Sequence, residues 1–117
     1  MKSIIIIPCF NEAERLPVHV FHEFLREQHS VDFVFVDDGS TDGTFQILQS
    51  ISKCFPLQTN ILKIPENCGK AEGVRQGMLF ALSRKPDLVG FWDADLSTPL
   101  SEINRFVSFF ATNQHIQ

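Results

Sequence analysis

The sequence predicts an α/β fold of three layers (α/β/α), in which helices cover both faces of a mainly parallel sheet. Strand-like runs alternate along the chain with helix-like stretches, and this alternation implies right-handed βαβ crossovers between parallel strands. The first run, Ser3–Ile7, is almost wholly apolar, as a strand covered on both faces should be. The other three predicted strands are Asp32–Val36, Leu57–Ile64 and Leu88–Trp92.

Composition places the chain among small globular domains. Its 117 residues suit one domain, and a hydrophobic content of 44% is enough to build a core, so we expect residues 1–117 to form a single unit. Twelve phenylalanines and no tyrosine indicate aromatic side chains packed inside. The net charge of -4 and the lack of a basic run argue against a nucleic-acid partner. They do not argue against a phosphate ligand, because a metal can supply positive charge.

Cysteine use and the N-terminal residues indicate a cytoplasmic protein. Cys9, Cys54 and Cys68 are odd in number and form no Cys-x-x-Cys pair, so we expect reduced, buried thiols and no zinc site. The apolar run before Pro8 is too short for a signal peptide or a membrane span.

A helix is predicted after the first strand. Pro8 ends that strand, and a proline at position 17 suits the first turn of a helix over 17–28. Leu16, Val20 and Phe24 recur at four-residue spacing and mark the buried face of this helix.

Turn residues separate the second strand from its helix. The segment Asp37–Gly43 contains Asx-type residues and two glycines, which is turn chemistry throughout. A helix over Thr44–Lys53 follows, with Ile47, Leu48 and Ile51 facing inward.

The remaining elements follow the same alternation. The third strand ends at Pro65, Asn67–Lys70 forms a loop, and a helix covers Ala71–Ser83. After the fourth strand, Thr98 can cap a last helix with Pro99 in its first turn. The apolar face of that helix would consist of Ile103, Phe106, Val107 and Phe110.

Polar clusters follow every predicted strand. In parallel sheets ligands bind outside the carboxyl ends of the strands, so these clusters should meet at one edge. This convergence is stronger evidence for a site than any single motif. The clusters are Asn11–Glu12, Asp37–Asp42, Asn67–Lys70 and Asp93–Asp95.

Asp93 and Asp95 are the most informative pair. They follow an apolar strand, where two carboxylates are costly unless a cation lies between them. In an extended segment both side chains would point the same way, which suits a shared divalent metal, or a metal plus a ribose. The alternative is that both acids cap the turn and the following helix.

The second cluster offers further acids. Asp37 could accept a hydrogen bond from a base N–H or a ribose hydroxyl. Asp38 and Asp42 have an alternative as solvated Asx-turn residues, and Gly39 serves backbone geometry under either interpretation.

The other two loops could contact a nucleotide. The backbone of Pro8–Glu12 could approach a base, although Glu12 could equally be a helix-start acid. Gly69 and Lys70 at a helix start are typical of phosphate binding by backbone amides and a cation. Lys70 as an ordinary surface lysine is the alternative.

Four ordered motifs resemble those of family-2 glycosyltransferases, which have the Rossmann-like GT-A fold, and the last of them resembles the family's DXD motif. The Gly-Lys-Ala stretch is similar to the one found in the polyprenyl-phosphate sugar transferase branch of this family. The matching segments cover nearly the whole chain: Ile4–Glu12, Val36–Thr44, Asn67–Met78 and Asp93–Asp95.

The resemblance implies transfer of a sugar from a UDP- or GDP-sugar donor, with Mg²⁺ or Mn²⁺, to a glycan, lipid-phosphate or protein acceptor. Asp37 would hold the base or ribose, Asp93 would approach the ribose or the metal, and Asp95 would bind the metal. The remaining residues expected around the donor are Pro8, Phe10, Asn11, Glu12, Asp38, Gly39, Gly69 and Lys70.

Family members continue well past this motif, so we expect the chain to lack the acceptor half and the general base beyond Gln117. The exposed edge of such a partial sheet invites pairing with a second copy, so a homodimer is expected. The full-length protein is expected in the cytoplasm or at the inner face of a membrane.

Three alternatives stay open. The chain could be a donor-binding fragment or remnant without turnover. It could be a haloacid-dehalogenase-type phosphohydrolase, because Asp93–Ser97 also resembles that nucleophile motif, although there the motif follows the first strand. A response-regulator-like module built on Asp37 and Asp38 fits poorly.

Overall fold

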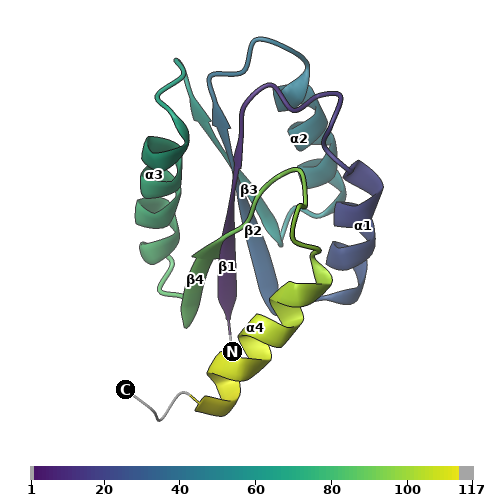
Figure 1. Ribbon diagram of the computed structural model, residues 1–117, viewed down its shortest axis with the longest axis vertical. Coiled ribbons are helices and arrows are strands. Elements are labelled where there is room, and N and C mark those ends of the chain that lie inside the picture. Colours follow the sequence, from purple (N-terminus) through teal and green to yellow (C-terminus); the bar gives the residue numbers. More distant parts are fainter. Residues whose placement is uncertain (1, 114–117) are drawn as a thin grey trace.

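The computed structural model describes residues 2–113, which form a parallel sheet with helices on both faces (Figure 1). The strand order is β3-β2-β1-β4, so the predicted three-layer α/β fold is confirmed. The strands are β1 (Ser3–Cys9), β2 (Val31–Asp38), β3 (Thr59–Ile64) and β4 (Leu88–Phe91). The helices are α1 (Val18–Glu27), α2 (Thr44–Cys54), α3 (Lys70–Leu82) and α4 (Ser101–Asn113).

The larger core lies between the sheet and the layer of α1, α2 and α4, and it is built on phenylalanine. The Phe21 ring meets Phe33 and Phe35 edge-on, with centroids 5.6 and 5.5 Å apart. The buried residues of α1 are Phe21, Phe24 and Leu25, whereas Val20 is only partly buried. The buried face is therefore the 21/24/25 row. The predicted series meets this face at Phe24, its Leu16 is buried just before α1, and only Val20 lies at the rim.

The smaller core lies under α3 on the opposite face. Alternate residues of β1 point to opposite faces, so Ile5 and Ile7 enter the larger core while Ile4 and Ile6 enter the smaller one. All four are at most 4% exposed. The prediction of a first strand covered on both faces is thereby confirmed.

Two strands extend beyond their predicted ends. β1 continues through Pro8 to Cys9, and β2 includes Asp37 and Asp38, which were expected in a loop. The carbonyl of Ile6 accepts a hydrogen bond from the Trp92 N–H, so Pro8, two residues on, turns its backbone toward the same side. β4 pairs with β1 only as far as Ile6, and the missing N–H of Pro8 therefore costs no ladder bond.

The bounds of β3, β4 and α4 also differ from the predicted ones. β4 ends at Phe91, lies at the sheet edge and is only partly buried. β3 begins at Thr59, because residues 56–58 form a turn. α4 begins at Ser101 after a short turn, so the predicted capping role of Thr98 is wrong; the Thr98 carbonyl instead accepts a hydrogen bond from Trp92 Nε1 at 2.8 Å.

Not all aromatic residues are inside. Ile103 of α4 is fully buried, but Phe106, Phe109 and Phe110 are 44%, 62% and 39% exposed. The prediction that phenylalanine serves the core is therefore right for α1 and β2 and wrong for α4. Among residues 2–113, no helix combines the length and the apolar character needed to cross a membrane.

Two glycines of α3 provide a matched test of packing against the sheet. A Cβ at Gly77 would lie 2.6 Å from Ile6 Cγ2, whereas one at Gly73 would meet only Val36 Cγ1, at 3.6 Å. We expect Gly77→Ala to destabilise the fold by about 1–3 kcal/mol, because overpacking outweighs the gain in helix propensity. Gly73→Ala should be neutral or stabilising by up to about 1 kcal/mol. Urea unfolding of both variants checks this, and equal effects would contradict the packing shown by β1 and α3.

Candidate functional site

The four polar loops converge at the carboxyl edge of the sheet, as predicted. They enclose an open pocket of about 500 Å³. Asn11, Asp37 and Gly39 are not among the lining residues, and Arg15 is a lining residue that the sequence did not indicate. The pocket is lined by Pro8, Cys9, Phe10, Glu12, Arg15, Asp38, Asn67, Gly69, Lys70, Gly73, Asp93, Ala94 and Asp95.

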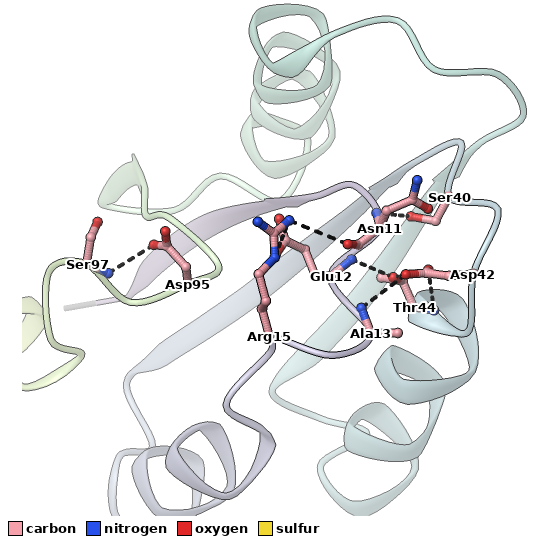
Figure 2. A network of polar contacts seen from close by, with 9 residues as sticks. All are labelled: Asn11, Glu12, Ala13, Arg15, Ser40, Asp42, Thr44, Asp95 and Ser97. Carbon is pink, nitrogen blue, oxygen red and sulfur yellow. Dashed lines mark hydrogen bonds and ion pairs between the residues drawn. The ribbon is translucent and has the colours of Figure 1, made fainter.

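The loop after β1 is tied to the loop after β2 by side chains (Figure 2). Consecutive backbone N–H groups of residues 11–13 donate to this second loop. Ser40 Oγ accepts from Asn11 at 3.0 Å, Thr44 Oγ1 from Glu12 at 2.8 Å, and Asp42 Oδ2 from Ala13 at 3.3 Å. These amides are therefore engaged within the protein, and the idea that they approach a nucleotide base does not hold for residues 11–13.

Asn11 and Asp42 complete this connection. The Asn11 side-chain oxygen accepts the Thr41 N–H at 2.9 Å, so its carboxamide holds the second loop. Asp42 accepts both the hydroxyl and the N–H of Thr44, the latter at 2.9 Å, which is an Asx turn at the start of α2. These bonds, the Thr44 hydroxyl first, lower the pKa of the Asp42 carboxyl. The Asx-turn interpretation of Asp42 is thus confirmed.

Asp37 lies in the interior at the end of β2. It is 1% exposed; Oδ1 accepts the Ser40 N–H at 3.2 Å, while Oδ2 has no hydrogen-bond partner among the described residues. A buried carboxylate oxygen without a donor is costly, so this atom is a ready acceptor. Its register partner Cys9 is also buried, and burial, followed by the charges of Glu12 and Asp37, raises the pKa of the Cys9 thiol.

Asp38 holds the loop before α3. Oδ1 accepts the Cys68 N–H at 2.8 Å, and Oδ2 accepts the Gly69 N–H at 2.9 Å and the Asn67 amide at 3.2 Å. Gly39 lets the two loops approach: its φ is +69°, and a Cβ there would lie 2.4 Å from the Asn67 nitrogen. The prediction that Gly39 serves backbone geometry is confirmed.

Arg15 enters the site through Glu12. The backbone N–H groups of Arg15 and Leu16 both donate to the Glu12 carbonyl, so residues 12–16 form a helix-like turn. Arg15 Nη2 lies 3.2 Å from Glu12 Oε1, a buried oxygen that makes an ion pair without hydrogen-bond geometry. The i,i+3 spacing of these opposite charges was the signal that could have indicated Arg15.

Asp93 and Asp95 both line the pocket, but the segment between them is not extended. The Leu96 N–H donates to the Asp93 carbonyl at 3.0 Å, so the chain turns directly after Asp93, and Leu96 has a φ of +56°. The expected parallel projection of the two carboxylates is therefore wrong. Asp93 Oδ1 lies 2.5 Å from Lys70 Nζ, while the exposed Asp95 accepts the Ser97 N–H at 3.0 Å.

Asp93 and Asp95 could supply only part of the coordination shell of a divalent cation. No group of three His, Cys, Asp or Glu side chains within residues 2–113 could hold a metal. Mg²⁺-type ions, however, usually take one or two carboxylates and complete their shell with phosphate oxygens and water. Asp93 already carries a cation, the Lys70 ammonium, so the site attracts positive charge.

Comparison with known proteins identifies the family. Residues 4–117 match the model of the family "Glycosyl transferase family 2". The chain is 36% identical over 111 residues to the dolichyl-phosphate beta-glucosyltransferase of Saccharomyces cerevisiae, covering 88% of this chain and 32% of that protein. It is 31% identical over 112 residues to the bactoprenol glucosyl transferase of Shigella phage SfX, covering 92% of this chain and 35% of the relative.

Solved structures share the fold. The mannosyltransferase PcManGT of Pyrobaculum calidifontis, in complex with GDP-Man and Mn²⁺, has a TM-score of 0.77 at 24% identity, over 94% of this chain and 32% of that one. S. aureus TarS 1-349 in complex with UDP-GlcNAc has a TM-score of 0.77 at 20% identity, over 97% and 32%. The chain thus spans about a third of the length of these proteins.

Replacing Asp38 tests its hold on the 66–69 loop. An asparagine has one oxygen acceptor, so in Asp38→Asn either the Cys68 or the Gly69 N–H loses its partner. We expect a loss of about 1–3 kcal/mol in unfolding free energy and faster hydrogen exchange at these two amides.

Asp95→Asn is the matched control for this loss. Asp95 is exposed and accepts one hydrogen bond, which an amide oxygen can also accept. Its unfolding free energy should change by less than about 0.5 kcal/mol. Equal losses in the two variants would contradict the role of Asp38.

Proposed function

This chain belongs to glycosyl transferase family 2, and on that premise we propose that it forms the nucleotide-sugar-binding part of a glycosyltransferase that uses a UDP- or GDP-sugar donor. The observation that carries the proposal is the pocket of about 500 Å³ at the carboxyl edge of a parallel sheet, with Lys70, Asp93 and Asp95 on its wall. The two solved neighbours are complexes with GDP-Man and with UDP-GlcNAc, so both nucleotide classes remain in the proposal.

The base and ribose are assigned to the loops after β1 and β2. Pro8 and Phe10 line the pocket, and the Phe10 ring, 42% exposed, offers a face to a base. Glu12, which lines the pocket, is the acceptor for ribose hydroxyls or a base N–H. Asp37 is buried outside the lining, so its unpartnered oxygen would reach the donor only if the loop after β2 rearranges. Asn11, Asp38 and Gly39 act indirectly, by holding the loops that shape the pocket.

The diphosphate is assigned to the start of α3 and the turn after β4. Gly69 and Lys70 begin α3, and Lys70 supplies a positive charge. Asp93 and Asp95 would hold Mg²⁺ or Mn²⁺, which when bound stabilises the negative charge on the leaving diphosphate. These two acids bring their charges to the same pocket from the turn after β4.

The acceptor proposed is a polyprenyl phosphate. Two relatives are named as bactoprenol and dolichyl-phosphate glucosyltransferases, which supports the polyprenyl-phosphate branch. A lipid-linked acceptor would place the reaction at a membrane surface, in agreement with the expected inner-face location. Glycan and protein acceptors are the alternatives.

A second candidate is donor binding without turnover. The chain spans about a third of its relatives' length, and a general base for acceptor activation is assigned to none of the described residues. Family membership favours both of these candidates over the phosphohydrolase and the response-regulator module.

Donor binding can be measured by thermal unfolding with UDP or GDP and Mn²⁺. At a nucleotide concentration 100 times Kd, we expect stabilisation of about 2.7 kcal/mol. This corresponds to a rise in Tm of roughly 10 °C for a domain of this size. The rise should disappear with a chelator and in Asp95→Asn, whose own stability is expected to stay near that of wild type.

Glu27→Gln, an exposed α1 residue outside the donor pocket, removes the same charge and should keep the rise in Tm. No rise with either nucleotide in the wild-type chain would contradict the proposed donor site.

We also propose that β4 pairs with β4 of a second copy. Its outer edge has no partner strand within residues 2–113, and Phe91 on it is 49% exposed. Sedimentation at rising concentration should show a dimer that Phe91→Lys dissociates. Leu57→Lys, at an exposed turn away from this edge, should leave it intact. A wild-type monomer at high concentration would refute the pairing.

A further inference from the structure

Lys70 is paired with Asp93, one of the two acids that are assigned to the metal. Its Nζ lies 2.5 Å from Asp93 Oδ1, joining the first residue of α3 to the turn after β4. The same ammonium lies 5.6 Å from the centre of the Phe91 ring, the last residue of β4. Lys70 and Asp93 are 57% and 44% exposed, so the pair is accessible from the pocket.

We propose that Lys70 is the resident counter-ion of Asp93, which a divalent metal must displace, and that this displacement couples metal binding to the nucleotide diphosphate. This inference rests on the proposed function. Lys70 is in this sense a positioning residue, because its ammonium neutralises Asp93 until the metal and the nucleotide bind.

Electrostatics supports the coupling. An ammonium and a divalent ion repel each other, and they cannot occupy the same carboxylate oxygen at contact distance. Lys70 contacts Oδ1 of Asp93, so a metal at that oxygen must replace the ammonium. A metal at the second oxygen would place two cations on one carboxylate, which their mutual repulsion disfavours. Because the pair is half-exposed, its loss costs on the order of 1 kcal/mol or less, which corresponds to a factor of about five in metal affinity.

The displaced ammonium needs another anion, and the pocket offers few. Both Asp38 oxygens are occupied by donors from the 67–69 loop, and Glu12 is paired with Arg15. The remaining lining acid, Asp95, belongs to the metal pair. A diphosphate would supply the missing anion, so nucleotide and metal should bind better together than separately.

Electron paramagnetic resonance of Mn²⁺ tests this directly, because only the free ion gives the sharp signal. The titration uses wild type, Lys70→Gln and Lys70→Arg, each with and without UDP or GDP. Lys53→Gln is the charge-matched control, since Lys53 is exposed in the last turn of α2 and does not line the pocket.

Without nucleotide, Lys70→Gln should bind Mn²⁺ about five times more tightly than wild type. Lys53→Gln and Lys70→Arg should stay near wild type. With nucleotide, Lys70→Gln should gain less Mn²⁺ affinity than wild type gains, because the ammonium that links the two ligands is missing.

Two results would overturn the inference. If Lys70→Gln binds Mn²⁺ no more tightly than Lys53→Gln, while wild type still forms a complex with metal and nucleotide, the counter-ion role is wrong and the proposed function stands. If no variant retains Mn²⁺ even with nucleotide, both are wrong.

Discussion

The candidate site depends most on the hydrogen bonds that the Asp38 carboxylate accepts from the loop before α3. This carboxylate lies at the end of β2, nearly buried, and accepts the backbone of the loop that begins α3. A buried ionised acid is tolerated where several N–H groups surround it, and here the loop supplies them. The loop at the start of α3, which carries Lys70, is therefore held by one side chain at the end of β2. Gly39 permits the contact because it carries no Cβ.

The same principle joins the first two loops. The backbone N–H groups of residues 11–13 donate to Ser40, Thr44 and Asp42, so polar residues after one strand satisfy the backbone after another. What remains facing the pocket is a mixture of charges with an excess of acid. Glu12, Asp38, Asp93 and Asp95 line it with only Arg15 and Lys70 to balance them. The excess of negative charge favours binding of a cation over binding of a free anion. A nucleotide diphosphate complexed with a metal ion would bring positive charge to the acids and phosphate oxygens to Lys70 and Arg15.

The sequence predicted the fold well because apolar runs and turn-forming residues alternate along it. The apolar run of β1, the turn residues after Asp38 and the apolar face of α2 all point to one topology. Strand ends were less predictable, since Pro8 is tolerated only where β4 has stopped, which depends on a strand distant in sequence. The convergence of the loops followed from topology. The separate roles of the acids could not be predicted in this way, because Asp38, Asp42 and Asp93 cannot be told apart until their hydrogen-bond and ion-pair partners are known.

The unequal lengths of β1 and β4 contribute to the shape of the pocket. β1 runs on to Cys9, whereas its pairing with β4 stops at Ile6, so the sheet has a notch in which Pro8 and Cys9 have a neighbour on one side only. The pocket opens at this notch, with Ala94 on the far side. The notch is a product of backbone register, which single substitutions rarely alter. Exchange of lining residues can therefore change which ligand is preferred while the notch beneath them is kept.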